Sequence, residues 1–515
     1  METDFLVIGA GVAGLRAAIE AAEAGRVLVL TKDRLTESAS EYAQGGIAVA
    51  LSDDDRVSLH EQDTMEAGDG LCDAGAVRVL VEQGPEEIQK LIEWGVEFDR
   101  EGTRLAFTQE GAHSRRRVLH AQGDSTGREI ARTLFQKAKS IPSISFQSFS
   151  VVVDLMEQNG EIRGALAWNG RERELVAIHS RAVLLATGGL GCVYWETTNP
   201  DVATGDGVAM AYRAGAEIAD MEMVQFHPTA LFLEGAPRFL LSEALRGEGG
   251  FLRNAAGERF MVRYHPKEEL APRDAVSRAI VSELQRARTG PVYLDLTHLE
   301  KGFVCRRFPR IYETCLHYGV DLESQPVPVH PAAHYAMGGV YTDYDGATTL
   351  PGLFAAGEVA CTGVHGGNRL ASNSLLEGLV FGARAGRTMR DEAGALAASP
   401  GVPQLGEPAP LPGNAVFDLR RLAWRRAGIV RSGEGLTHGL EELERMRPFF
   451  EKGLCRNSRQ GFEADNLYDA VSLIARSALA RRESRGCHYR SDEPAKRPEF
   501  QKHSRVAKGH DVRFM

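Results

Sequence analysis

The stretch Val7-Ile8-Gly9-Ala10-Gly11-Val12-Ala13-Gly14, near the start of this 515-residue chain, decides its fold. It begins inside Phe5-Leu6-Val7-Ile8, a wholly apolar run that is typical of a strand buried on both faces. After the glycines, Leu15–Ala24 predicts an alanine-rich helix and Val27–Leu30 a second buried strand. A G-x-G-x-x-G spacing indicates dinucleotide binding when it stands in this order of strand, turn, helix and strand.

Each glycine of the motif has its own role in such a turn. Gly9 permits the tight turn, Gly11 lets the backbone approach a pyrophosphate, and Gly14 lets the helix pack close to the strand. The helix N-terminus then faces the phosphates with its partial positive charge. Thr31-Lys32 stands where NAD-binding folds carry an acidic residue for the adenosine ribose, which weighs against NAD.

The composition is that of a globular protein and excludes several classes of function. Hydrophobic residues make up 43% and charged residues 25%, and the net charge of -10 argues against a nucleic-acid or anionic-membrane binder. The seven cysteines form no C-x-x-C pair, which argues against an iron–sulfur or zinc framework and indicates a reducing compartment. The acidic start Met1-Glu2-Thr3-Asp4 and the lack of a transmembrane-length apolar stretch predict a cytoplasmic protein.

Changes of texture along the chain predict a divided domain. A predicted buried strand leads into Ala186-Thr187-Gly188-Gly189, the second motif that is typical of two-part flavin-binding folds. The apolar pattern of a buried strand occurs again at Gly352–Val359. In between, strand–helix alternation stops, as in an inserted cap. We therefore expect an α/β, Rossmann-like FAD-binding domain split by an α+β capping domain and followed by a helical domain. The expected ranges are 1–220 with 336–400 for the FAD-binding domain, 221–335 for the cap, 393–412 for a linker and 413–515 for the helical domain.

Local patterns add expectations about single elements. Val77–Trp94 predicts a helix that Gly84-Pro85 breaks or restarts. Thr126–Lys139 predicts an amphipathic helix and Ile144–Met156 the first of three β-runs. The tail from Asp492 is polar and gives no structural prediction.

Cationic and acid–base side chains gather in four stretches, which are Gln225–Thr229, Pro272–Asp274, Ala333–Tyr335 and His365–Arg369. Taken singly, each has an ordinary structural explanation, such as a turn, a helix-start ion pair, a core histidine or a solvated loop. On a flavin scaffold they together indicate a clamp for a small dicarboxylate, because guanidinium groups pair bidentately with carboxylates. The loop Glu110–Arg117, by itself, reads as a solvated basic loop.

The chain resembles the succinate dehydrogenase/fumarate reductase flavoprotein superfamily along nearly its whole length. Eight separate motifs occur in the order of that family, which makes the resemblance very specific. They are Gly9–Gly14, Ala43–Gly46, Ala186–Gly189, Phe226–Thr229, Pro272–Asp274, Gly357-Glu358, His365–Arg369 and Arg482–His488.

Three features are similar to the aspartate-oxidising branch of this superfamily. Ala39 stands where the dehydrogenases carry the histidine that attaches FAD, which implies non-covalent FAD, and Glu110–His120 and Arg369–Glu377 match the oxidase versions of these stretches. Aspartate differs from succinate by an ammonium group, so its recognition needs an added anion, and we expect Glu110 to supply it. This reverses the solvated interpretation of the loop. Ala112 departs from the family pattern, since a second glycine is common there.

The resemblance implies a role for each residue of the site. Arg273 is the catalytic residue, since it matches the proton-transfer arginine of the superfamily. The substrate-binding residues are Glu110, His227, Ser242, His334 and Arg369. The FAD-binding residues are Gly9, Ala10, Gly11, Val12, Ala13, Gly14, Lys32, Ala39, Ser40, Glu41, Tyr42, Ala43, Gln44, Gly45, Gly46, Asp206, Glu358, Ser374 and Leu375. No metal site is expected.

The implied activity is FAD-dependent oxidation of L-aspartate to iminosuccinate, with hydride passing from Cα to flavin N5 and oxygen or fumarate as the acceptor. This reaction opens de novo NAD biosynthesis, and quinolinate synthase, which follows, is a candidate transient partner. The alternative is a soluble fumarate reductase or succinate dehydrogenase-type flavoprotein, and Ala39 argues against its covalent-FAD forms. A non-catalytic flavin scaffold has no need of a dicarboxylate clamp.

Overall fold

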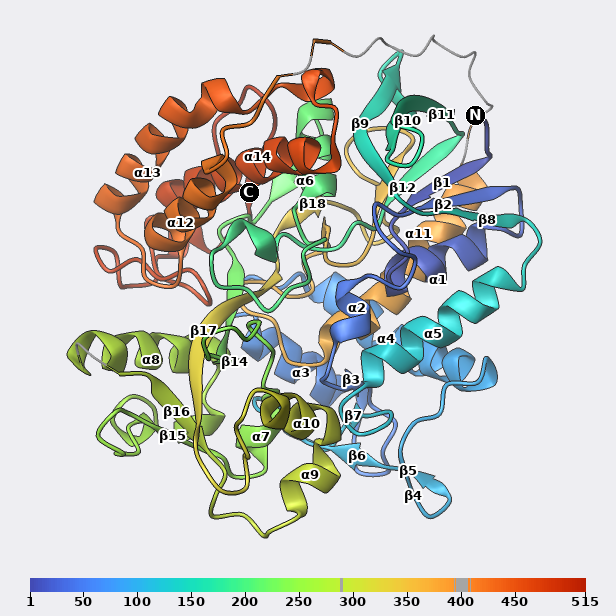
Figure 1. The fold of residues 1–515 in the computed structure, drawn as a ribbon. Helices are drawn as coiled ribbons and strands as arrows, with labels where there is room; N and C mark the ends of the chain where they lie inside the picture. Colours follow the sequence, from blue (N-terminus) through green and yellow to red (C-terminus); the bar gives the residue numbers. More distant parts are fainter. Residues whose placement is uncertain (288–289, 393, 395–405, 408) are drawn as a thin grey trace.

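Five parallel strands form the sheet around which the rest of the chain is arranged (Figure 1). In this computed structural model, which describes residues 1–287, 290–392, 394, 406–407 and 409–515, their spatial order is β19-β12-β1-β2-β8. The strands are β1 (Phe5–Ile8), β2 (Val27–Leu30), β8 (Ile144–Gln147), β12 (Ala182–Leu185) and β19 (Leu353–Ala355). Every residue of β1, β2 and β12 is buried, as expected for parallel strands that are covered on both faces.

Different structures cover the two faces of this sheet. Phe5 and Val7 belong to a core shared with four helices, whereas Leu6 and Ile8 belong to a core shared with a small antiparallel sheet. The helices are α1 (Val12–Ala21), α4 (Ala74–Glu93), α5 (Thr126–Lys139) and α11 (Asn373–Glu392), and the strands are β9 (Ser150–Gln158), β10 (Glu161–Asn169) and β11 (Glu174–His179). The helix predicted at 126–139 is confirmed as α5.

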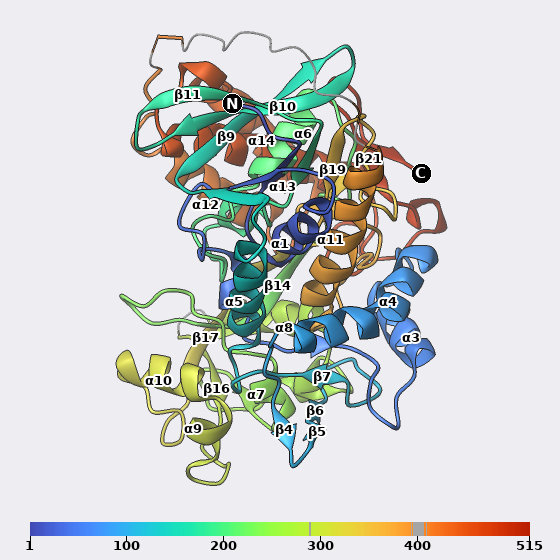
Figure 2. The ribbon, with the colours of Figure 1, turned by 90° about the vertical axis from the view of Figure 1, so that its right-hand side faces the viewer.

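Helices α1 and α11 lie side by side against the sheet (Figure 2). A Cβ added to Gly382 of α11 would lie 2.6 Å from the carbonyl oxygen of Ala13, and one added to Gly386 would lie 2.5 Å from that of Ala17. Because these positions have no side chain, the two helix backbones approach closely. This packing places Ser374, at the start of α11, beside the glycine turn in one cavity wall.

Two local expectations were wrong. Helix α4 continues through Gly84-Pro85. A glycine before proline lacks the Cβ that clashes with the proline ring in a helix, and Gly84 also lets Leu376 pack within 3.0 Å of the position a Cβ would take. The predicted run Ile144–Met156 is two strands, β8 and β9, because Phe149 adopts a left-handed backbone conformation with φ 58° between them.

The segment predicted as a cap forms its own sheet and core (lower part of Figure 1). Its strands have the order β14-β17-β16-β15 and pair antiparallel. The elements are β14 (Val224–Leu231), β15 (Phe251–Arg253), β16 (Val292–Asp295), β17 (Val327–Ala336), α7 (Ala244–Gly247), α8 (Arg273–Ala287), α9 (Phe303–Arg307) and α10 (Pro309–His317). Strands and helices are thus mixed, as in the predicted α+β cap, and the domain boundaries themselves stay predictions.

The C-terminal part combines three helices with an edge of a further sheet. The helices are α12 (Ala415–Ala427), α13 (Gly433–Met446) and α14 (Arg459–Ala480). The tail, which gave no structural prediction, forms two strands of the sheet β20-β18-β13-β21-β22. These strands are β13 (Ile218–Ala219), β18 (Gly339–Tyr341), β20 (Ala360–Cys361), β21 (Ser504–Val506) and β22 (Arg513–Phe514). The end of the chain is therefore tied to β13, which directly precedes the cap.

Several short elements complete the fold. They are α2 (Ala39–Tyr42), α3 (Val57–Ala67), α6 (Asp206–Ala214), β3 (Ile47–Ala48), β4 (Arg100–Glu101), β5 (Arg104–Leu105), β6 (Phe107–Thr108) and β7 (Val118–Leu119). The predicted linker at 393–412 falls mostly outside the described residues. Among the helices that the structure describes, none has the length and apolar character needed to cross a membrane.

Candidate functional site

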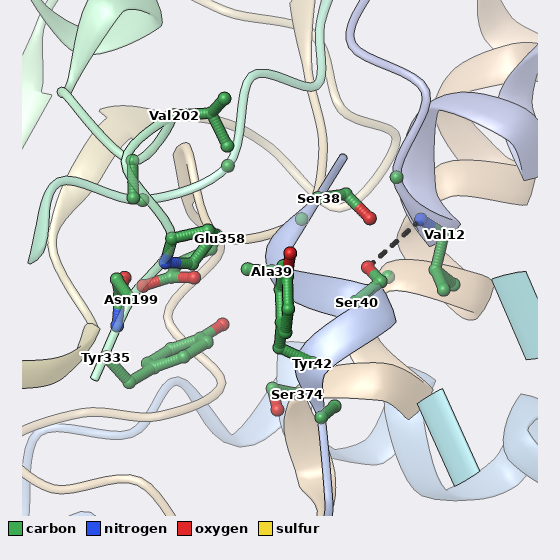
Figure 3. Close-up of a pocket in the computed structure, with 18 of the residues that line it drawn as sticks. Val12, Ser38, Ala39, Ser40, Tyr42, Asn199, Val202, Tyr335, Glu358 and Ser374 are labelled. Atoms are coloured by element: carbon green, nitrogen blue, oxygen red, sulfur yellow. Dashed lines mark hydrogen bonds between the residues drawn. The ribbon is translucent and has the colours of Figure 1, made fainter. Parts of the chain in front are cut away.

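Residues of the parallel-sheet domain and of the cap line one cavity. Its walls come from the turn between β1 and α1, from α2, from β14 and β17 and from the start of α11. In the close-up view, Glu358, Tyr335 and Asn199 lie on one side of the cavity, and Ala39 and Tyr42 of α2 lie on the other (Figure 3). Segments that are far apart in the sequence therefore share one cavity.

Helix α1 begins at one end of the cavity and presents backbone N–H groups there. Its N-cap is Gly11, which has no side chain to accept from these groups, and Val12 N–H donates to Oγ of Ser40 (3.3 Å; dashed in Figure 3). Such a helix start, with its positive dipole end, binds anions such as phosphates. Gly9 has φ +114°, and a Cβ there would lie 2.1 Å from the carbonyl oxygen of Ala186, so only glycine fits.

Two partly buried ionisable groups, Lys32 and Glu358, also line the cavity. Lys32 follows β2, and its Nζ lies 2.6 Å from Asp206 and 2.8 Å from Glu463. Burial disfavours the ammonium, but the two carboxylates outweigh burial and raise the pKa of Lys32. Glu358 accepts a hydrogen bond from Ala336 N–H (3.0 Å), and burial raises the pKa of its carboxyl to about 7. Glu358 can therefore donate to or accept from a hydroxyl group at neutral pH.

The predicted cofactor-binding residues line this cavity, with the exceptions of Gly14 and Glu41. Gly14 packs under the turn, where a Cβ would lie 2.1 Å from the carbonyl oxygen of Gly9, as expected for close helix–strand packing. Glu41 accepts a hydrogen bond from Nε of Arg128 (2.9 Å). Since successive residues of a helix point in different directions, α2 turns Glu41 away from the wall that Ser40 and Tyr42 form.

Two arginines meet at the other end of the cavity. Arg273, the first residue of α8, and Arg369 both donate to Oε1 of Gln225, over 3.0 Å and 3.2 Å. The guanidinium of Arg369 lies 4.6 Å from the ring centroid of Tyr335, and its buried Nε has no hydrogen-bond partner. Burial and the charge of Arg273 lower the pKa of Arg369 to about 10. Two like charges are thus held together where an anion would relieve them.

Two histidines stand beside these arginines on paired strands. His227 of β14 and His334 of β17 contact each other edge to face, with ring centroids 5.2 Å apart. Pro228 cannot donate to the strand ladder, and the pairing of β14 with β17 shifts register there. Burial lowers the pKa of both histidines well below the ordinary value, so both rings are neutral.

The orientation of His227 leaves one donor free. Its Nδ1 accepts from Thr229 N–H (3.3 Å), so the proton of the neutral ring is on Nε2. This buried Nε2 has no hydrogen-bond partner. Buried polar groups are normally satisfied, so an unpartnered donor in a cavity wall indicates a place for a ligand acceptor. Ser242 and His334 line the same wall.

Two buried carboxylates complete this end. Glu110 accepts from Oγ of Ser372 (2.6 Å), and burial together with the neighbouring Glu243 raises the pKa of Glu110. Burial also disfavours the charge on Glu243, but Arg273 and Arg246 outweigh this effect and lower its pKa. Nε of Arg273 donates to Glu243 over 2.6 Å. The solvated interpretation of the Glu110 loop is therefore wrong for Glu110 itself, which is 4% exposed.

Three residues of this end were missed from the sequence. Glu243 follows the predicted Ser242, Tyr335 follows the predicted His334, and Ser372 lies in the stretch that resembles the oxidases. The usable signal was their place directly beside predicted residues. The predicted catalytic and substrate-binding residues all lie in the cavity wall, namely Glu110, His227, Ser242, Arg273, His334 and Arg369.

Comparison with known families agrees with this geometry. Residues 4–375 match the family model described as FAD binding domain, and residues 417–514 match the model described as fumarate reductase flavoprotein C-term. An L-aspartate oxidase from Synechocystis is 44% identical over 97% of this chain and 96% of its own length. An L-aspartate oxidase from Yersinia pestis is 42% identical over 96% of each chain.

Solved structures show the same fold. An E. coli quinol fumarate reductase chain superposes with a TM-score of 0.92 at 32% identity, covering 100% of this chain and 96% of its own. Sdh1 from Mycobacterium smegmatis superposes with a TM-score of 0.87 at 33% identity, covering 99% and 93%. The predicted fold class and the predicted superfamily are confirmed.

Proposed function

The chain belongs to the L-aspartate oxidase family, and from this premise we propose how its cavity oxidises L-aspartate to iminosuccinate. FAD is the cofactor of this family, and its prediction is confirmed. The observation that carries the proposal is the substrate end of the cavity. There, Nε2 of His227 and Nε of Arg369 are buried without partners, beside Arg273 and Glu110.

The flavin end fits FAD. The N-terminus of α1 and Gly11 would hold the pyrophosphate, Glu358 a hydroxyl of the sugar chain, and α2 the wall of the ring system. No histidine occurs between Glu37 and Gly46, and Ala39 lines the cavity, which supports non-covalent binding. When bound, FAD supplies the acceptor for the hydride that leaves Cα of the substrate.

The clamp at the other end suits two carboxylates. Arg369 and Arg273 offer guanidinium groups that pair with carboxylate oxygens, and the free Nε2–H of His227 and the hydroxyl of Ser242 add neutral donors. A bound dicarboxylate would relieve the repulsion between the two arginines. It would also satisfy donors that have no partner in the protein.

Glu110 distinguishes L-aspartate from succinate in this proposal. Its carboxylate lies next to the arginines of the clamp, and the hydroxyl of Ser372 donates a hydrogen bond to one of its oxygens, Oε2. The other oxygen, Oε1, is left for an ammonium group. A charge-assisted hydrogen bond of this kind contributes about 1.5–3 kcal/mol.

Arg273 and Glu243 form the proton-transfer pair. Their 2.6 Å contact joins the guanidinium at the substrate to a carboxylate that also lines a second cavity. When fumarate is the acceptor, Arg273 donates the proton that accompanies the returning hydride and regains it through Glu243. In L-aspartate oxidation the ammonium first gives a proton to solvent water, and the lone pair of the resulting amine then assists departure of the hydride from Cα.

Oxygen and fumarate are the acceptors we propose, because fumarate fits the same clamp without needing Glu110. Iminosuccinate hydrolyses in water, so its transfer to quinolinate synthase is the next step we propose in NAD biosynthesis. A fumarate reductase-type activity with succinate as donor is the second candidate. It is disfavoured because succinate has neither an ammonium group to pair with Glu110 nor an amine lone pair to assist departure of the hydride.

Product analysis tests this function. In air, the FAD-loaded protein should convert L-aspartate and oxygen to iminosuccinate and hydrogen peroxide in equal amounts, with the imine hydrolysing to oxaloacetate and ammonia. With fumarate in the absence of oxygen, succinate should replace hydrogen peroxide. Formation of neither product from L-aspartate by the FAD-loaded protein would overturn the proposal.

A further inference from the structure

Helix α3 has an unusual buried face. Its buried side chains are His60, Asp63 and Thr64, at positions i, i+3 and i+4, and all three are polar. A helix normally buries an apolar stripe, because burying polar groups costs free energy unless they are hydrogen-bonded. A polar buried face therefore has to be explained by the groups that it binds.

The first group is the loop that carries Glu110. Oδ2 of Asp63 accepts from the N–H and the Oγ of Ser114, each over 2.8 Å, and also from the guanidinium of Arg117. Arg117 in turn makes a bidentate pair with Asp55 over 2.8 Å and 2.9 Å. The far end of the loop is thereby fixed to α3.

The second group is the segment that leads into α11. Nε2 of His60 donates to Oδ1 of Asn373 over 2.8 Å, and Nδ2 of Asn373 donates to Oγ1 of Thr64 over 3.0 Å. Ser372, which donates to Glu110, is the neighbour of Asn373. Helix α3 thus binds both the loop that carries Glu110 and the segment that carries Ser372, through Ser114, Arg117 and Asn373.

A histidine of the loop adds a direct connection between the two groups. Nδ1 of His113 accepts from Arg117 over 3.3 Å, and its Nε2 donates to the carbonyl oxygen of Ala371 over 2.9 Å. Burial lowers the pKa of His113 to about 4, so the ring stays neutral and keeps this pattern at neutral pH.

The loop also borders two cavities. Glu110 lines the main cavity, and Gly111 and Ala112 line a second cavity, which Asp63 and Ala371 also line. The pairing of β6 with β7 closes the loop at its base, and the hydrogen bonds described above fix the part that carries Glu110 between the two cavities.

We propose that the polar face of α3 (His60, Asp63, Thr64) is a positioning device for recognition of the substrate ammonium. It rests on the proposed role of Glu110. The three residues do not touch substrate, and they act by fixing the distance between Glu110 and the carboxylate clamp. A displacement of about 1 Å at such a site lowers activity about 100-fold.

Kinetics with two substrates tests the proposal. Asp63→Ala in the FAD-loaded enzyme should raise KM for L-aspartate about 10- to 100-fold, with a smaller change in kcat, because its effect cannot exceed loss of the Glu110 contact itself. The KM of Asp63→Asn should lie between those of the wild type and Asp63→Ala. Fumarate reduction by the reduced enzyme should keep its kcat/KM within about threefold, because fumarate has no ammonium. Asp53→Asn is the matched control, since its carboxylate is exposed and pairs with Arg104 at the surface.

One result would overturn the proposal: an unchanged ratio of L-aspartate to fumarate kcat/KM in Asp63→Ala, whether both values are retained or both fall by the same factor. If that variant does not fold, Thr64→Val, which removes the bond to Asn373 with little change of shape, should lower the ratio about three- to tenfold. A wild-type enzyme that binds L-aspartate no better than succinate would instead contradict the role of Glu110.

Discussion

The two ends of the cavity are built in different ways. At the flavin end, the proposed pyrophosphate site consists mainly of backbone from one contiguous motif, with Gly9 and Gly11 at a helix N-terminus. The substrate end consists of buried charged side chains from separate segments, with Arg273 and Arg369 meeting at Gln225. From this difference we propose that shape and the helix dipole hold the cofactor, whereas the substrate is selected by charged groups whose hydrogen bonds are incomplete until it binds.

The largest effect is expected from a methyl group at the flavin end. Gly9→Ala places Cβ 2.1 Å from the carbonyl oxygen of Ala186, in a backbone with φ +114°. This substitution should lower the free energy of unfolding by more than about 3 kcal/mol, and the purified variant should not retain FAD. Denaturation and flavin absorbance of the purified variant measure both. Gly215→Ala is the control, because φ is +101° there but nothing lies within 4 Å, so FAD should stay bound.

The next largest effect is expected at the substrate end, from a substitution that should not change FAD binding. Arg369→Leu removes a buried guanidinium that we assign to a substrate carboxylate and should lower kcat/KM for L-aspartate about 1000-fold. Flavin absorbance should remain that of the wild type. Loss of FAD in proportion to loss of activity would show that the two ends are not separable.

Glu110→Gln should separate the two substrates. Loss of a charge-assisted hydrogen bond to the ammonium should lower kcat/KM for L-aspartate about 10- to 100-fold, and fumarate reduction should be unchanged or faster. Steady-state kinetics with both substrates measure this. Equal effects on both would assign Glu110 to general catalysis.

The same residue should give a pH dependence. L-Aspartate binding needs ionised Glu110, whose pKa is raised by burial and by Glu243, so kcat/KM should fall with decreasing pH at values above the ordinary range of a glutamate. The kcat/KM for fumarate reduction should not fall in this pH range, and in Glu110→Gln the fall should be absent for L-aspartate as well. If kcat/KM of Glu110→Gln still falls there, another group is responsible for the pH dependence.

A small stabilisation is expected from the loop that carries Glu110. Ala112 has φ +67°, a conformation that costs a residue with a Cβ about 1–2 kcal/mol, so Ala112→Gly should raise the free energy of unfolding by about 1 kcal/mol. Asn159→Gly, with φ +56°, should gain less, because asparagine tolerates this conformation. Thermal or chemical denaturation of both variants provides the comparison.

Much of the flavin end could be predicted from the sequence because its residues are neighbours in the chain. The roles of Gly9 and Gly14 follow from spacing alone, and the structure shows the close contacts that these roles require. Glu41 lies outside the cavity wall, and a contiguous motif alone does not tell which residues of the short helix α2 face the cavity. The predicted helix break at Pro85 was wrong because the preceding Gly84, which has no Cβ, removes part of the steric conflict with the proline ring.

The substrate end could be predicted only through the family resemblance. Arg273 and Arg369 belong to separate segments, and only folding brings them to a shared partner. Glu243 was missed because its function depends on its ion pair with Arg273, which local sequence does not reveal. The strands of the tail were missed for a similar reason, since β21 forms by pairing with the distant β13.

Anaerobic mixing of the FAD-loaded protein with L-aspartate, and separately with succinate, tests the selection of substrate by charge most directly. L-Aspartate should bleach the flavin absorbance, and succinate at the same concentration should not. Bleaching by succinate but not by L-aspartate would contradict the role given to Glu110 and would make the chain a fumarate reductase-type enzyme.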